Sequence, residues 1–79
     1  MTNVSDNNYI YFWVGKNIRK YRKLKGWTQK ELAQRCNLTE KYIQAIESST
    51  QVKTYSLNTF YHISKILEIH PRQLLDDER

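Results

Sequence analysis

The stretch from Thr28 to Ser48 of this 79-residue chain, TQKELAQRCNLTEKYIQAIES, has the pattern of two short helices joined by a tight turn. Thr28 and Glu31 have the spacing of a capping box, in which a hydroxyl and a carboxylate each accept a backbone N–H at a helix start. Asn37 tolerates the positive φ that a sharp turn requires, and Thr39 can cap a second helix. We therefore predict one helix on each side of Asn37.

The second of these helices has two different faces. At about 100° per residue, Ile43 and Ile46 point to one side and predict the buried face. The opposite arc holds Glu40, Lys41, Gln44, Ala45 and Ser48. A face that offers a carboxylate, an ammonium and an amide is suited to reading base edges in a DNA groove. The spacing is that of a helix-turn-helix, with residues 40 to 48 as the reading helix.

The chain resembles the Cro/repressor (XRE) family of DNA-binding domains, and the similarity extends well beyond these two helices. That family has a hydrophobic-Gly, Ile and Arg pattern in its first helix, then a Gly-hydrophobic-Ser/Thr-Gln-x-Glu-Leu-Ala segment and an Ile-x-x-Ile/Leu-Glu ending. The matching residues are Val14, Gly15, Ile18, Arg22, Gly26, Trp27, Thr28, Gln29, Glu31, Leu32, Ala33, Ile43, Ile46 and Glu47. The resemblance covers roughly residues 12 to 76. In size the chain is similar to restriction-modification controller proteins and compact phage repressors.

The fold implied by the resemblance is a λ repressor-like domain, an all-α, compact five-helix bundle that contains the helix-turn-helix. Composition agrees, because two glycines, one proline and apolar spacings of three and four favour helices over strands. We expect the first helix to run from Asn8 or Tyr11 to Lys25, with Gly26 ending it. Ser56 should cap a fourth helix and Pro71 should open a short fifth one.

A chain of 79 residues allows one domain with a small core. We predict a polar, flexible N-terminal extension over residues 1 to 10 and the DNA-binding domain over residues 11 to 76. An acidic tail is expected over residues 77 to 79.

The resemblance also implies roles for individual residues. Glu40, Lys41 and Gln44 are expected to read bases. Contacts to the DNA backbone are expected from Thr28, Gln29, Lys30, Tyr42, Ser48, Thr50 and Lys53. For Tyr42, a position in the core is an equal alternative. Arg22 and Glu47 are expected to form a structural ion pair, because these two positions pair in the family.

The positive charge is concentrated in the helix-turn-helix half of the chain. Residues 14 to 53 hold ten Lys and Arg against three Glu, which gives +7, while each flank sums to −1 and the whole chain to +5. A basic cluster can be a solubilising face. Since this one surrounds a candidate reading helix, we expect it to bind phosphates.

Several classes of site are excluded by composition. Cys36 is the only cysteine, so neither an intramolecular disulfide nor a thiolate metal site can form, and a reducing cytoplasm is the expected compartment. We interpret Cys36 as a small core residue. His62 and His70 lie eight residues apart without clustered carboxylates, so we predict no metal site.

We likewise predict no enzymatic activity, no cofactor and no small-molecule ligand. Two glycines cannot build a phosphate-binding loop, and no serine, histidine or aspartate stands in a recognisable nucleophile context. The longest apolar run, Tyr9 to Val14, is too short to cross a membrane.

The functional prediction is a sequence-specific transcriptional regulator, a repressor or controller that binds double-stranded DNA as a homodimer at an inverted repeat. The alternatives are an antitoxin and a protein-interaction module of the same fold; an antitoxin is expected to carry a longer toxin-binding extension. The first candidate dimer surface combines Ile69, Leu74 and Leu75 with the neighbouring face of the fourth helix. The second is the aromatic segment Tyr9 to Trp13, for which packing onto the outside of the domain is the other interpretation.

Overall fold

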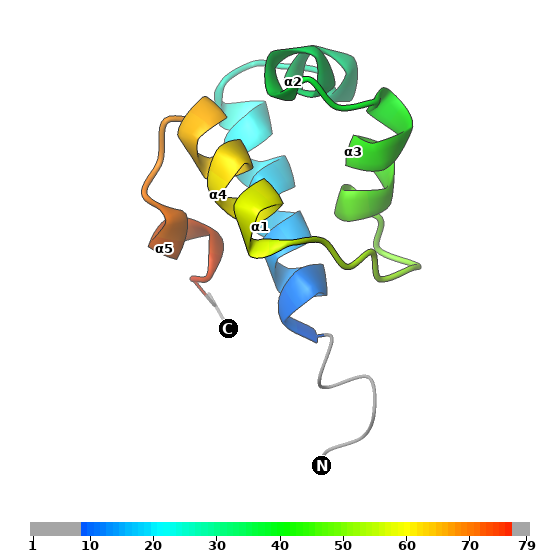
Figure 1. The fold of residues 1–79 in the computed structure, drawn as a ribbon. Helices are drawn as coiled ribbons and strands as arrows, with labels where there is room; N and C mark the ends of the chain where they lie inside the picture. Colours follow the sequence, from blue (N-terminus) through cyan, green and yellow to red (C-terminus); the bar gives the residue numbers. More distant parts are fainter. Residues whose placement is uncertain (1–8, 77–79) are drawn as a thin grey trace.

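The computed structural model describes residues 9–76, and these form five α-helices and no strand (Figure 1). The helices are α1 (Tyr9–Leu24), α2 (Gln29–Cys36), α3 (Glu40–Glu47), α4 (Leu57–Ile66) and α5 (Pro71–Leu74). The predicted all-α, five-helix fold is confirmed. Because α1 begins at Tyr9, Tyr9 and Ile10 belong to this helix and not to the extension predicted for residues 1–10. Residues 1–8 and the predicted tail, 77–79, lie outside the described residues.

Side-chain caps and a proline determine where four of the helices begin. At α2 the Thr28 hydroxyl accepts the N–H of Glu31, and the Glu31 carboxylate accepts the N–H of Thr28, which completes the predicted capping box. Thr39 and Ser56 cap α3 and α4 with their hydroxyls. Pro71 occupies the start of α5, where the missing N–H costs no helical bond.

Left-handed residues end the first two helices. Gly26, just after α1, has φ 76°. Its N–H donates to the Lys23 carbonyl at 2.9 Å, and the Trp27 N–H donates to the Arg22 carbonyl at 3.2 Å. This is a Schellman motif, which favours glycine at the left-handed position. Asn37 has φ 58° after α2, so the turn forms without glycine.

The core is built by residues from every helix. Ten apolar side chains are buried: Val14, Ile18, Leu32, Ala33, Cys36, Ile43, Ile46, Ile63, Leu67 and Leu74. Helix α1 runs through the middle of the bundle and contacts both α3 and α5, which lie on opposite sides of it (Figure 1). Each fully buried Leu or Ile contributes about 1.5–3 kcal/mol through removal of its apolar surface from water. The core therefore holds α3 against α1, and α2 against α3 and α4.

Helix α1 crosses the C-terminal end of α3 at Gly15. A Cβ atom on Gly15 would lie 2.1 Å from the carbonyl oxygen of Ile46 and 3.8 Å from the Cα of Glu47. Only a residue without a side chain allows the two backbones to approach this closely. Gly15 thus fixes the distance between α1 and α3.

The C-terminal segment is bound to α1 by side chains. The buried Asn17 amide donates to the carbonyl oxygens of Leu74 at 2.8 Å and Asp76 at 2.9 Å, and the Trp13 indole also donates to the Asp76 carbonyl. These bonds satisfy carbonyls that the end of α5 leaves open. Leu74 is completely buried within the monomer. Its predicted place on a dimer surface is therefore wrong, because the helix packs against its own core.

Candidate nucleic-acid interface

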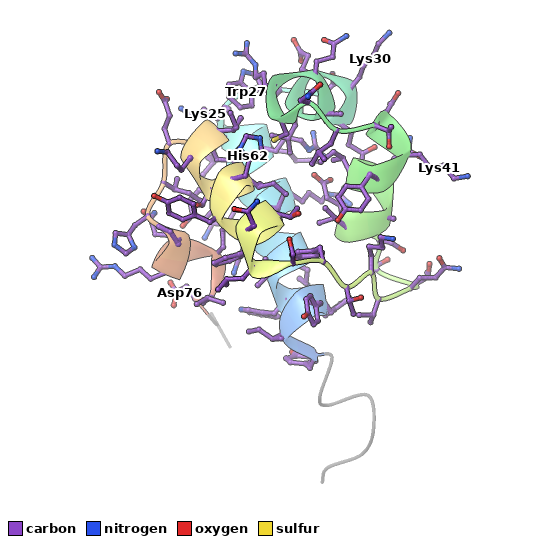
Figure 2. All side chains as sticks on the ribbon, in the orientation of Figure 1. Lys25, Trp27, Lys30, Lys41, His62 and Asp76 are labelled. Carbon is purple, nitrogen blue, oxygen red and sulfur yellow. The ribbon has the colours of Figure 1, made fainter. Side chains whose placement is uncertain are left out.

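The polar face of α3 points into solvent. Glu40, Lys41 and Gln44 are exposed, whereas Ile43 and Ile46 on the other side of the helix are buried in the core. Figure 2 shows Lys41 extending away from the bundle. The three residues predicted to read bases therefore share one accessible helix face. Their side chains supply an acceptor, a cationic donor and an amide that both donates and accepts.

The N-terminal end of α2 provides positive potential beside this face. The first backbone hydrogen bond of α2 runs from the Leu32 N–H to the Thr28 carbonyl. The N–H groups of Gln29 and Lys30 come before Leu32 in the helix, so they have no carbonyl partner within it and point out of the helix end. The Lys30 side chain is exposed, and in Figure 2 it extends from α2 on the same side as Lys41. Free N–H groups, the helix dipole and a lysine together suit a phosphate.

The capping box keeps the carboxylate of Glu31 in its charged form. The backbone N–H of Thr28 holds the pKa of Glu31 below its usual value. The charged carboxylate of Glu31 accepts the N–H of Thr28 at the start of α2. A phosphate approaching Gln29 and Lys30 would meet the end of α2 with its cap already formed.

A buried ion pair connects three helices behind the interface. Arg22 Nε donates to Glu47 Oε2 at 2.8 Å and Arg22 Nη2 to Glu47 Oε1 at 3.0 Å, and the two side chains are 8% and 1% exposed. Arg22 Nη1 also donates to the Trp27 carbonyl at 2.7 Å. The pair therefore joins the end of α1 to the end of α3 and to the turn that leads into α2.

Gln29 is attached to the same ion pair. Its Nε2 donates to Glu47 Oε1 at 3.1 Å, so the half-buried side chain is held in one orientation. An amide carries two N–H donors. One is used by Glu47, which leaves the second for a partner outside the protein. Residue identities predict a role for Gln29, but its attachment to Glu47 is a tertiary contact that no local pattern indicates.

The loop between α3 and α4 forms the edge of this surface. The Ser48 hydroxyl accepts the N–H of Thr50 at 3.1 Å and of Gln51 at 3.2 Å, which folds the loop back over the end of α3. Thr50 and Lys53 are exposed, and Lys53 Nζ lies 5.2 Å from the centre of the Tyr42 ring. Tyr42 is half-buried and packs against the core, so it has features of both predicted roles.

A tyrosine that the sequence pattern does not single out anchors the far end of the loop. The Tyr55 ring meets the Tyr11 ring edge to face at 5.2 Å between centroids, which ties the loop to α1. Burial raises the pKa of Tyr55, and its hydroxyl has no hydrogen-bond partner among the described residues. Tyr55 follows a polar loop in the sequence, where no apolar periodicity indicates burial.

The two histidines and the cysteine, which could have formed a metal site or a reactive site, have structural contacts instead. His62 Nε2 bonds the Cys36 carbonyl at 3.0 Å, while His70 caps α5. Burial raises the pKa of the Cys36 thiol to about 11, so at neutral pH it is a protonated core residue. Within residues 9–76 there is no group of three or more potential metal ligands. In the same part of the chain, no helix has the length and hydropathy needed to cross a membrane.

Comparisons with known proteins place the chain among DNA-binding regulators. Residues 18–74 match a family described as helix-turn-helix. Control protein C.BamHI of Bacillus amyloliquefaciens is 37% identical over 70 residues, which are 87% of this chain and 84% of that protein. The HTH-type transcriptional regulator SinR of Bacillus subtilis (strain 168) is 31% identical over 65 residues, which are 82% of this chain but only 58% of SinR.

The fold is also shared with a solved DNA complex. The crystal structure of SinR, the master regulator for biofilm formation, in complex with DNA superposes with a TM-score of 0.71 at 32% identity, covering 80% of this chain and 98% of that one. The related proteins are named as a transcriptional regulator and a control protein. These names support the prediction that the chain is not an enzyme.

Proposed function

Because the chain belongs to the helix-turn-helix family of the Cro/repressor (XRE) type, we propose that it is a sequence-specific DNA-binding transcriptional regulator. The observation that carries the proposal is the exposed face of α3, formed by Glu40, Lys41 and Gln44 and lying beside the open N-terminal end of α2. The solved complex of SinR with DNA supports this use of the fold.

In the proposed mechanism, α3 enters the major groove and α2 lies across the DNA backbone. Glu40 can accept from cytosine N4, Lys41 can donate to guanine, and Gln44 can pair with adenine. Gln29 and Lys30 would bind a phosphate at the start of α2, and Thr28, Tyr42, Ser48, Thr50 and Lys53 would complete the backbone contacts. Occupancy of the operator would then block or recruit RNA polymerase.

Two glutamine variants separate base reading from backbone binding. Gln44→Ala is expected to relax sequence preference at one or two positions, because a good base contact provides about 1–3 kcal/mol of discrimination. Gln29→Ala is expected to weaken binding to all sequences alike, since a phosphate contact carries no sequence information. Selection of bound sites from a random DNA pool, followed by affinities for single-base variants, measures both. If Gln44→Ala loses affinity uniformly and keeps its preferences, the assignment of base reading is wrong.

The general proposal is tested by salt dependence. An electrophoretic shift with the selected site at two salt concentrations should show affinity falling steeply as salt rises, because bound lysines and arginines release counterions from DNA. A protein-interaction module that kept the fold without DNA affinity would show no selected site and no such salt effect. That outcome would overturn the proposed function.

We further propose that the functional unit is a twofold homodimer on an inverted repeat, with its two α3 helices about 34–36 Å apart, one turn of DNA. A single helix-turn-helix contacts too few base pairs to compete with the other sites of a genome. The candidate surface is an apolar groove of about 210 Å³ lined by Ile10, Tyr11, Val14, Tyr55, Ser56, Leu57, Phe60 and Leu75. The groove includes Leu75 from the first predicted dimer surface and Tyr11 from the second.

Leucine variants test this surface. Leu57 is 79% exposed at the groove, and Leu24 is 72% exposed at the end of α1, away from the groove residues. Leu57→Glu is expected to shift the protein from dimer to monomer in sedimentation at micromolar concentration and to reduce binding to the full palindrome. Leu24→Glu is the control and should remain dimeric. A wild-type protein that stays monomeric with and without a palindromic site would contradict the dimer.

A further inference from the structure

The exposed surface of α1 carries a concentration of positive charge. The helix contains five cationic side chains and no carboxylate. Arg22 is buried against Glu47, and the other four are exposed: Lys16, Arg19, Lys20 and Lys23. The helix therefore presents a cationic surface outside the helix-turn-helix itself.

Two of these cations lie on the flank of α1 that is next to α3. Gly15 and Arg22 mark this flank, because Gly15 meets the Ile46 backbone and Arg22 bonds Glu47. Arg19 is four residues after Gly15 and three before Arg22, and Lys23 is four residues after Arg19. Helical residues separated by three or four positions are neighbours on one side. Arg19 therefore lies beside Gly15 and Arg22 on the α3 side, and Lys23 lies one turn further along α1, toward the turn that leads into α2.

The other flank of α1 has neighbours of its own within the chain. It faces the C-terminal segment through Trp13 and Asn17, which bond carbonyls there, and through Tyr21, whose hydroxyl accepts a bond from Gln73. Two of the α1 lysines lie over rings on this side, because Lys16 Nζ is 5.6 Å from the centre of the Trp13 ring and Lys20 Nζ is 5.3 Å from the centre of the Tyr21 ring. Among the described residues, Arg19 and Lys23 make no such ring contact.

Neither Arg19 nor Lys23 takes part in an ion pair within the described part of the chain. The acidic group where α1 meets α3, Glu47, is already bonded by Arg22 and Gln29. Their charges are accordingly available to an anion. The rise between them is about 6 Å, four residues at about 1.5 Å each, so the two side chains can reach different phosphates of one strand.

We infer that Arg19 and Lys23 bind the DNA phosphate backbone, extending the contact made at the start of α2 onto the flank of α1. The inference rests on the proposed DNA-binding function and adds a surface that the helix-turn-helix alone does not contain. Contacts to phosphate fix the register of the protein on the duplex without reading bases. They should therefore raise affinity for all sites and leave the preferred sequence unchanged.

The test compares two double variants with equal loss of charge. Arg19→Gln/Lys23→Gln removes the two cations from the α3 side, and Lys65→Gln/Arg72→Gln removes two exposed cations from α4 and α5. The affinity of each protein for the selected duplex is measured over a series of salt concentrations. Melting curves and sedimentation of both variants are used to check that the fold and the oligomeric state are kept. Arg19→Lys/Lys23→Arg preserves the charges and is expected to keep the wild-type salt slope.

For each phosphate that a variant no longer neutralises, the slope of log K against log salt should become shallower by about 0.9. We expect a change of about 1.8 per bound subunit for Arg19→Gln/Lys23→Gln, twice the value for one phosphate, with lower affinity for every sequence and an unchanged selected site. The Lys65→Gln/Arg72→Gln slope should change by less than half as much. Equal slopes for the two variants would overturn the inference and leave the proposed function standing, whereas a wild-type protein without salt-dependent binding to any duplex would overturn both.

Discussion

Replacing Arg22 by alanine is expected to lower the free energy of unfolding by about 3–5 kcal/mol, because it leaves the Glu47 carboxylate buried without its cation. The Glu47 side chain is 1% exposed and receives two hydrogen bonds from Arg22. After the substitution only the bond from Gln29 would remain. The Trp27 carbonyl would also lose its donor. Denaturant unfolding followed by circular dichroism measures the loss.

Arg19→Ala is the matched control for this effect, because Arg19 lies on the same helix and is exposed. It should change stability by less than about 0.5 kcal/mol, as exposed substitutions usually do. The double variant Arg22→Ala/Glu47→Ala should be less unstable than the sum of its single variants, since it removes the uncompensated charge together with its partner. If Arg22→Ala and Arg19→Ala destabilise the protein equally, the ion pair does not hold the helices together.

Substitution of Gly15 by alanine should destabilise the fold by about 3 kcal/mol, at the upper end of the usual cost of overpacking. The added Cβ would lie 2.1 Å from the Ile46 carbonyl oxygen, which belongs to the backbone, so no side chain can rotate away to make room. The helices α1 and α3 would have to separate. In a helix without this contact, Gly→Ala would be stabilising by about 1 kcal/mol, so the sign of the change tests the close crossing directly.

Gly26→Ala provides the comparison. Gly26 has φ 76°, and no atom beyond its two chain neighbours lies within 4 Å of the position that a Cβ would take, so alanine there meets backbone strain but no clash. Left-handed backbone costs a non-glycine residue about 1–2 kcal/mol. We expect Gly15→Ala to be the less stable of the two and also to weaken DNA binding, because the position of α3 changes. A Gly15→Ala protein as stable as the wild type would refute the proposed role of this glycine.

Arg22 and Gly15 act on the same element. One fixes the end of α3 to α1 by a buried ion pair, and the other sets the distance at which the two backbones cross. Base reading requires that side chains reach hydrogen-bonding distance of base edges. The polar face of α3 is therefore useful only if its support holds it rigidly, and these two residues provide that support.

Local signals along the chain are enough to place the starts of α2, α3 and α4. Thr28, Thr39 and Ser56 each bond a backbone N–H within three residues, and Asn37 adopts the left-handed turn from its own side-chain chemistry. Because each signal involves neighbours in the sequence, it can be identified without knowledge of the packing. The apolar spacing of α3 separates its buried face from its polar face for the same reason.

Contacts between distant segments, by contrast, follow from the packing of the bundle. Asn17 binds carbonyls 57 and 59 positions away, which places Leu74 in the core, and Gln29 bonds Glu47 18 positions away. Position 15 requires glycine because the backbone of α3 lies against it, and Tyr55 is covered because its ring meets Tyr11 of α1. Both features therefore depend on partners from other helices. Local propensity carries no information about such contacts, because they arise when the packed core brings distant segments together.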